Sequence, residues 1–417
     1  MIRENLIEQL NNSKKSKRLT ALKQLKKLEK KDATLIPKLR EYDTNIHIHS
    51  FYSFSPYSPT KAAYMAYKSG LKTMGIVDHD TLSGANEFLK ACDILNRAGT
   101  VGFECRVHFD VFNGEETINN PAQKNNAYIT VHGVPKKYIK KADDFLKLLR
   151  EKRNLRNIKM TAIINENFKD DNISIDFYND VIPLSKLKEG GSVTERHLLY
   201  ILGLKIIAKF GKGKELVDFL YKKGYELNDM QRVFLLEKDN PYYEYDLLCV
   251  LKGKIKTFYV AATDECVDIK ELVSFSNSIG AITAYPFNST VNYGQENLDK
   301  LFIQLKNAGI NAVSYSPLKI TDEHRKKVQN LCRHYELLEI NGNDINSPRN
   351  KFDNEELLKE EFANLTDSSW AVIGHDRMAN LDIINGMFTD KAINRSPRLK
   401  DREILYSQIG KSLYKYE

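Results

Sequence analysis

Residues 45–59 read NIHIHSFYSFSPYSP, and the fold expected of the whole chain follows from this stretch. His47 and His49 lie two positions apart in an apolar segment that is typical of a β-strand. Because the side chains of a strand alternate between its faces, both imidazoles are expected to point to the same side. Two neutral imidazoles on one face are suitable ligands for a divalent cation. The stretch therefore predicts part of a metal site at the end of a strand.

Three later segments place further candidate ligands at the ends of short apolar runs. TMGIV ends in residues 78–80 (DHD), GF precedes Glu104, and ITV precedes His132. The chain has only nine histidines in 417 residues, so four of them in such places form a pattern. One isolated histidine is more simply a buried polar group. The series favours a metal site at the C-terminal rim of a parallel β-barrel.

Short β-rich runs alternate with helical runs over residues 43–140 and again over 253–346, which predicts a parallel α/β architecture. Residues 141–252 read as helices on both sides of a Gly-Gly break and are expected to form a helical insertion in the barrel.

The two ends of the chain have a different pattern. Leucines recur every three to four residues among lysines in residues 1–42, which predicts a helical N-terminal appendage. Residues 347–417 are expected to be a C-terminal extension that packs on the barrel, with a strand at residues 370–376 (WAVIGHD).

Composition limits the class of protein. No apolar run approaches the about 20 residues of a membrane span, and the N-terminal segment lacks the apolar core of a secretory signal. Five scattered cysteines without a CxxC motif indicate reduced thiols and a cytoplasmic location. The net charge of +8 is compatible with phosphate-bearing substrates or nucleic acid, although lysines on amphipathic helices can equally be solvated faces.

The candidate ligands indicate a reaction class. A carboxylate such as Glu104 has two oxygens and can bridge two cations. Histidines with carboxylates suit zinc, manganese or iron better than magnesium or calcium. A water molecule acidified by such a cation becomes a hydroxide nucleophile, so no serine or cysteine is required. Phosphoester hydrolysis is the expected reaction, and hydrolysis of a C–N bond is the alternative.

These motifs resemble the polymerase-and-histidinol-phosphatase (PHP) family of metal-dependent phosphoesterases. The HxH opening with SFYSFSPYSP, the DH at residues 78–79, GFE at Glu104 and the later His132 match the family's order of motifs. AITAYPF aligns with the family's A-H-P, and INGNDIN aligns with its closing G-S-D-x-H. The resemblance spans residues 43–346. It implies an α/β fold, a distorted (β/α)7 TIM-like barrel with ligands at the strand ends.

The helical insertion resembles that of the family's nucleotide phosphatase and RNA exonuclease branch. There a G-R-P-H element helps to hold the substrate phosphate, and residues 194–197 (TERH) are similar to it. The resemblance implies that Arg196 and His197 bind phosphate, since an arginine can grip phosphate with two nitrogens. A surface arginine and a helix-start histidine are the plainer alternative.

The sequence departs from the family at three expected ligand positions, which hold Phe54, Tyr285 and Asn346. The resemblance implies that the first metal keeps its full set of ligands: His47, His49, Glu104 and Asp344. The second metal would keep Glu104 and His132. The third would keep only His79. We expect one strong metal site, a second weaker one and no third.

A second segment, GHDRM at residues 374–378, competes for the role of closing motif. The order of helix, strand and turn before Asp344 fits better. His375 or Asp376 could still reach the rim and complete the depleted site.

The sequence thus predicts a metal-dependent phosphoesterase that acts on a phosphorylated small molecule or a short nucleic acid. His79, His132 and Glu104 are the expected catalytic residues. The alternative is a catalytically weakened metal-binding module with a regulatory or nucleic-acid-binding role.

Overall fold

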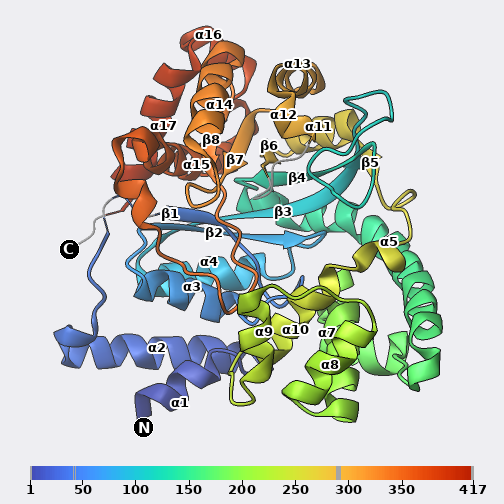
Figure 1. Cartoon of the computed structure of the whole chain (residues 1–417). Helices are drawn as coiled ribbons and strands as arrows, with labels where there is room; N and C mark the ends of the chain where they lie inside the picture. Colours follow the sequence, from blue (N-terminus) through green and yellow to red (C-terminus); the bar gives the residue numbers. More distant parts are fainter. Residues whose placement is uncertain (1, 41, 43, 288–292, 415–417) are drawn as a thin grey trace.

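The computed structural model describes residues 2–40, 42, 44–287 and 293–414, and their strands form a nearly closed barrel (Figure 1). The expected start of the barrel at Asp43, together with residues 1 and 41 of the N-terminal segment and residues 415–417 of the C-terminal segment, lies outside the described residues. The strands are β1 (Thr44–Ile48), β2 (Thr73–His79), β3 (Ala98–His108), β4 (Asn126–His132), β5 (Val267–Asp268), β6 (Ile282–Pro286), β7 (Ala312–Tyr315) and β8 (Leu338–Asn341). Their order is β1-β2-β3-β4-β6-β7-β8, with β5 paired to the end of β3. The distorted seven-stranded barrel expected from the sequence is confirmed.

One strand of the barrel runs against the others. β4 is antiparallel to both of its neighbours, β3 and β6, whereas the other neighbours around the barrel are parallel. The connection between β3 and β4, residues 109–125, contains no helix, so the chain turns back beside β3 instead of crossing over. The sequence predicts a parallel barrel, and β4 is the strand that departs from this prediction. His132 ends a strand whose direction is opposite to that of β1, β2 and β3.

The barrel closes between β8 and β1. The His49 N–H donates to the Ile345 carbonyl (2.9 Å), and the Ile345 N–H donates to the His47 carbonyl (3.1 Å). The Asn45 side chain adds a hydrogen bond to the Asn343 carbonyl (2.8 Å). This closure brings the turn after β8 next to the end of β1, although about 300 residues of chain separate them.

Helices cover the outside of the barrel. They are α3 (Pro59–Lys68), α4 (Ala85–Leu95), α11 (Ile269–Ser278), α12 (Tyr293–Glu296), α13 (Leu298–Ala308) and α14 (Asp322–Tyr335). A large apolar core lies between these helices and the outward faces of the strands. A smaller core includes Ile46, Ile282 and Ile340 and is completed by Ala371 and Val372 of α15 (Ala363–Leu381).

The C-terminal segment is helical, with α15 followed by α16 (Asp390–Arg395) and α17 (Leu399–Ser412). The strand expected at residues 370–376 is wrong, because this short apolar run lies in the middle of α15. Periodicity alone cannot separate a buried helix from a buried strand over so few residues. A Cβ atom at Gly374 would overlap the Tyr406 carbonyl oxygen, so this glycine permits the close approach of α15 and α17.

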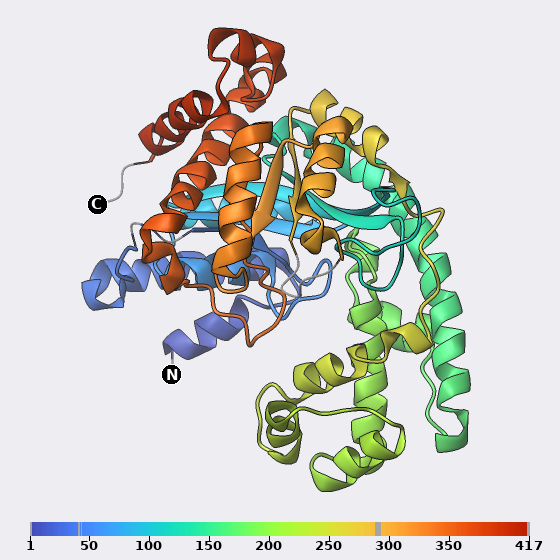
Figure 2. The same cartoon turned by 45° about the horizontal axis from the view of Figure 1, so that its top comes forward.

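The helical insertion has a core of its own. Its helices are α5 (Ile139–Asn167), α6 (Ile182–Leu184), α7 (Glu195–Phe210), α8 (Lys214–Lys222), α9 (Asp229–Leu236) and α10 (Tyr243–Lys252). Leu198, Leu202 and Leu247 are buried in this core. Figure 2 shows the insertion as a lobe that extends away from the barrel.

The N-terminal helices α1 (Ile2–Gln9) and α2 (Lys15–Lys31) pack against the barrel's outer helices. Arg18 of α2 makes a buried bidentate ion pair with Glu87 of α4, with N–O distances of 2.8 and 2.5 Å. In the described ranges, no helix combines the length and apolar character needed to cross a membrane.

Candidate metal centre

His47 and His49 lie at the C-terminal end of β1, as the HxH spacing predicts. Their ring centroids are 5.1 Å apart, and both side chains are buried. The pairing of β1 with β2 shifts register between Asn45 and Ile48, which is where the histidine-bearing segment begins. The two imidazoles therefore lie side by side at one end of the barrel.

Glu104 and His79 come from the next two strands. They are partners in the parallel register of β2 and β3, so their side chains share one face of the sheet. Glu104 Oε2 lies 3.2 Å from His47 Nε2, 3.7 Å from His49 Nε2 and 4.0 Å from His79 Nδ1. One carboxylate oxygen is thus surrounded by three imidazoles.

Asp344, in the turn after β8, completes the group. Its Oδ1 lies 3.3 Å from His49 Nε2, and its Oδ2 accepts a 2.6 Å hydrogen bond from the Asn346 side chain. In a tetrahedral site with bonds of about 2.0–2.2 Å, neighbouring ligand atoms lie about 3.3–3.6 Å apart. The distances from His47 to Glu104 (3.2 Å), from Glu104 to His49 (3.7 Å) and from His49 to Asp344 (3.3 Å) are close to this spacing.

Several buried polar atoms here have no hydrogen-bond partner among the described residues: His79 Nδ1, His132 Nδ1 and Asp344 Oδ1. Such groups are rare in native proteins and call for an explanation such as an ion. The candidate ligand atoms of His47, His49 and Asp344 lie within 4.8 Å of one another, as do those of His49, His79 and Glu104. Imidazole and carboxylate donors fit zinc, manganese or iron.

The protonation of these groups differs from one to the next. Burial lowers the pKa of His49, and it lowers that of His79 well below the usual range, with His49, Arg153 and Arg106 adding to the effect. Burial opposes the proton on His47 too, but the Glu104 carboxylate raises the pKa of His47 overall. Burial likewise opposes ionisation of Asp344, and His49 and His47 nevertheless hold its pKa below the usual range. His49 and His79 are thus neutral at physiological pH, the form that binds a cation.

Asp78 supports the site without belonging to it. Its carboxylate accepts hydrogen bonds from the Ser50 N–H (2.7 Å), the Ser50 hydroxyl (2.6 Å) and the Ser53 hydroxyl (2.6 Å). The Ser53 oxygen lies 3.3 Å from His49 Nδ1. Asp78 therefore fixes the turn after β1, and through Ser53 it orients the His49 ring.

His132 lies at the end of β4, next to His47. Thr130 is the register partner of Glu104, so His132, two residues further along β4, lies on the same face of the sheet, and its ring centroid is 6.3 Å from that of His47. His132 Nε2 lies 3.0 Å from the Thr130 hydroxyl, and burial lowers the pKa of His132 to about 3. The structure thus places this residue next to His47 instead of at the rim.

Arg196 and His197 have different positions. His197 Nδ1 accepts a hydrogen bond from the Thr194 N–H (3.0 Å) and caps the start of α7, while burial lowers the pKa of His197 to about 3. Arg196 donates to the Asn346 side chain (3.1 Å), and Asn346 donates to Asp344. Arg196 therefore reaches the centre through Asn346, and His197 is occupied by the helix.

The other two departures from the family pattern lie outside the centre. Phe54 is buried in the core of the insertion, with its ring 5.0 Å from that of His197 and 5.5 Å from that of Tyr200. Tyr285 is fully buried in the outer core of the barrel, with its ring 5.3 Å from that of Phe287.

The competing segment of α15 does not reach the rim. His375 Nε2 lies 2.8 Å from the Gly280 carbonyl, and its Nδ1 accepts a hydrogen bond from the Met387 N–H (2.9 Å). Asp376 is buried in the same helix. The expectation that His375 or Asp376 could complete the site is therefore wrong, because both nitrogens of His375 have partners at Gly280 and Met387, and Asp376 is paired with Arg377.

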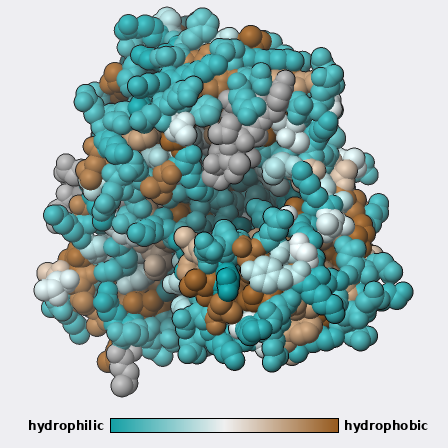
Figure 3. All heavy atoms as spheres, in the orientation of Figure 1, coloured by the Kyte–Doolittle hydropathy of each residue, from teal (hydrophilic) through white to brown (hydrophobic). Residues whose placement is uncertain are grey.

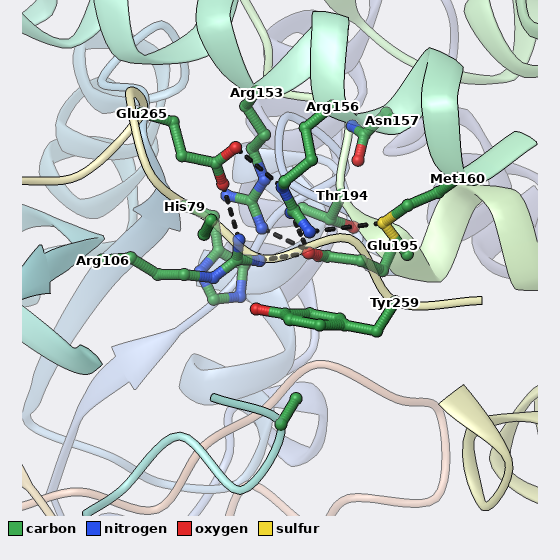
Figure 4. A network of polar contacts seen from close by, with 12 residues as sticks. His79, Arg106, Arg153, Arg156, Asn157, Met160, Thr194, Glu195, Tyr259 and Glu265 are labelled. Carbon is green, nitrogen blue, oxygen red and sulfur yellow. Dashed lines mark hydrogen bonds and ion pairs between the residues drawn. The ribbon is translucent and has the colours of Figure 1, made fainter. Parts of the chain in front are cut away.

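A buried ionic network next to His79 was not found by sequence reasoning. It consists of Arg106, Arg153, Arg156, Glu195 and Glu265 (Figure 4). The sequence does contain a sign of this network: Arg150, Arg153 and Arg156 are three residues apart, which places them on one face of α5.

Fold and site together define a β/α-barrel protein with a histidine and carboxylate centre at the strand ends. The PHP domain model matches residues 45–402, and the chain belongs to this family. No curated protein matches the sequence.

Two solved structures are similar in fold, each at 14% identity and a TM-score of 0.51. One is described as a candidate metal-dependent phosphoesterase from Bifidobacterium adolescentis, and the match covers 77% of this chain and 96% of that one. The other is an amidohydrolase from Chromobacterium violaceum with bound sulfate and no metal, covering 75% of this chain and 91% of that one.

Proposed function

We propose that this protein is a metal-dependent phosphoesterase that hydrolyses a phosphomonoester or phosphodiester, such as a nucleotide. The observation that carries the proposal is the position of Glu104, whose Oε2 lies 3.2–4.0 Å from nitrogens of His47, His49 and His79. A divalent cation bound there would acidify a water molecule and would neutralise charge on a phosphate oxygen. Its donors would be His47, His49, Glu104 and Asp344.

His79 and Glu104 are the residues available to a second cation. Glu104 has a second carboxylate oxygen, and His79 Nδ1 has no hydrogen-bond partner in the described part of the chain. Because its pKa lies well below the usual range, His79 is unprotonated and free to bind a cation, and it is a poor acid or base for proton transfer near neutral pH. The sequence predicts His132 as a ligand of the second cation. His132 lies beside the His47 ring, so we assign His79 as that ligand instead.

Two positively charged side chains near the centre favour the binding of an anionic substrate. Arg196 approaches Asp344 closely enough to lower the pKa of that carboxyl, and the exposed Lys319 contributes to the same shift. Figure 3 shows a hollow near the centre of one face, surrounded mainly by hydrophilic residues. Positive charge near a recessed site raises the local concentration of phosphate-bearing substrates.

The test is hydrolysis of p-nitrophenyl phosphate, bis(p-nitrophenyl) phosphate and nucleotides with manganese, zinc or iron. Wild type should be active, and Glu104→Gln should lose more than about 100-fold in kcat/KM. Asp176→Asn, which alters only an exposed helix cap, is the matched control and should stay fully active. A Glu104→Gln variant with wild-type activity would contradict the proposal.

The second candidate is a metal-binding module without catalysis, and it rests on Phe54 and Tyr285 at expected ligand positions. It requires metal binding without hydrolysis of any phosphoester. If the basic surfaces then bind nucleic acid, that affinity should fall steeply with salt. An amide substrate panel in the same screen tests the C–N hydrolysis alternative.

A further inference from the structure

Next to the proposed metal centre, three buried arginines converge on one carboxylate. Arg106 comes from β3, Arg153 and Arg156 come from α5, and all three are at most 5% exposed. Glu195, the first residue of α7, accepts from Arg153 at 2.9 Å through Oε2 and from Arg106 and Arg156 through Oε1. Figure 4 shows these side chains meeting from separate elements. We call Arg106, Arg153 and Arg156 the arginine cradle.

The carboxylate in the cradle is ionised. Burial by itself opposes the charge of Glu195, but Arg106, Arg156 and Arg153 together hold the pKa of Glu195 well below the usual range. The N-terminus of a helix adds a further preference for negative charge at this position. Glu195 is thus held as an anion by three guanidiniums and a helix end.

The same arrangement suits phosphate. Guanidinium groups bind phosphate and carboxylate oxygens with the same planar pair of donors, and helix N-termini are anion sites in many proteins. Two other carboxylates pair with the cradle: Glu265 with Arg106 (2.6 Å) and Arg156 (2.7 Å), and Asp80 with Arg153. Without Glu195, three arginines would face two carboxylates, and one positive charge would remain buried and uncompensated.

The cradle borders the metal centre. Asp80 directly follows His79, and Arg106 lies two residues beyond Glu104 on the same face of β3. Arg106 Nε donates to the Tyr128 hydroxyl (3.0 Å), and the Tyr128 ring lies 6.0 Å from that of His79. One side chain, Tyr128, therefore separates His79 from the cradle.

We propose that the arginine cradle is an anion-binding site that the chain fills with its own Glu195 carboxylate, and that Glu195 thereby excludes substrates carrying a second phosphate beside the scissile one. The first part stands on the contacts of Glu195 alone. The second part rests on the proposed phosphoesterase function. Glu195 is then a specificity-determining residue that restricts the enzyme to substrates with one phosphate on this side.

The experiment compares thermal unfolding of chelator-treated wild type, Glu195→Ala and Glu195→Gln in inorganic phosphate and in chloride of equal ionic strength. Glu195→Ala removes the carboxylate and opens space, so phosphate should raise its unfolding temperature saturably, by about 3 °C at about 100 times the dissociation constant. Glu195→Gln removes the charge and keeps the space filled, so it should respond little. Glu87→Ala is the matched control, because it uncovers one buried arginine, Arg18, instead of three.

The outcomes separate clearly. A Glu195→Ala variant that folds only in phosphate supports the cradle, whereas one that folds in neither buffer overturns it, because the anion should replace the carboxylate. Equal phosphate responses in Glu195→Ala and either wild type or Glu87→Ala also overturn it.

A second readout tests the specificity on metal-loaded protein. The ratio of kcat/KM for a bisphosphorylated substrate to that for its monophosphorylated analogue should rise about 10-fold or more in Glu195→Ala. An unchanged ratio refutes the role in specificity. If no variant hydrolyses any phosphoester, the proposed function fails, while the phosphate response still decides the cradle.

Discussion

Removal of the Asp78 carboxylate should damage both stability and metal affinity. In Asp78→Ala, one backbone N–H and two hydroxyls lose a buried acceptor. Hydrogen bonds to a charged group contribute about 1.5–3 kcal/mol each. Burial raises the pKa of Asp78, which shows that desolvation offsets part of this gain. We therefore expect a loss of about 3–5 kcal/mol in the free energy of unfolding.

The same substitution should weaken metal binding, because Ser53 would no longer hold the His49 ring. Loss of such outer support typically lowers metal affinity about 10–100-fold. Urea unfolding of the metal-free protein and competition for zinc with a chromophoric chelator measure the two effects. Asp176→Ala, which removes an exposed helix cap, should cost about 0.5–2 kcal/mol and leave metal affinity unchanged. Wild-type zinc affinity in Asp78→Ala would refute the reasoning.

Three further results are expected. Burial raises the pKa of Asp376 from 3.8 to about 6, so the folded protein holds this proton more tightly and stability falls as pH rises through that window. The free energy of unfolding of Asp376→Asn should therefore exceed that of wild type by about 3 kcal/mol at pH 7.5 and should nearly equal it near pH 3.5. Urea unfolding at the two pH values measures this, and a difference that does not change with pH would contradict it. Arg18→Ala leaves Glu87 buried without its ion-pair partner, and it should lower the free energy of unfolding by about 3–5 kcal/mol, partly recovered when Glu87 is also replaced by leucine. Zinc at about 100 times its dissociation constant should raise the unfolding temperature of wild type by about 3 °C and not that of Asp344→Ala, and equal shifts would count against Asp344 as a ligand.

Much of the candidate site could be predicted because His47, His49 and His79 lie at strand ends, whereas β3 continues for four residues beyond Glu104. The HxH spacing places His47 and His49 on one side, and the apolar runs before His79 and Glu104 end at the same level of the barrel. These local rules depend only on the two-residue period of a strand.

Other features depend on contacts that no local pattern shows. The residues that connect β3 to β4, 109–125, form no helix, and β4 runs antiparallel to β3. This direction places His132, the last residue of β4, beside His47. The apolar run at residues 370–376 has no periodicity that separates helix from strand, and packing against α17 decides for helix. The cradle joins Arg106 to Glu265, which are 159 positions apart in the chain.

The most direct test of the metal centre is elemental analysis of wild type, Glu104→Ala and Glu87→Ala after saturation with zinc or manganese and dialysis. We expect at least one equivalent of metal per chain in wild type and in Glu87→Ala, and almost none in Glu104→Ala, with circular dichroism confirming that all three are folded. Folded wild type without bound metal, or Glu104→Ala with the wild-type content, would contradict a cation site centred on Glu104.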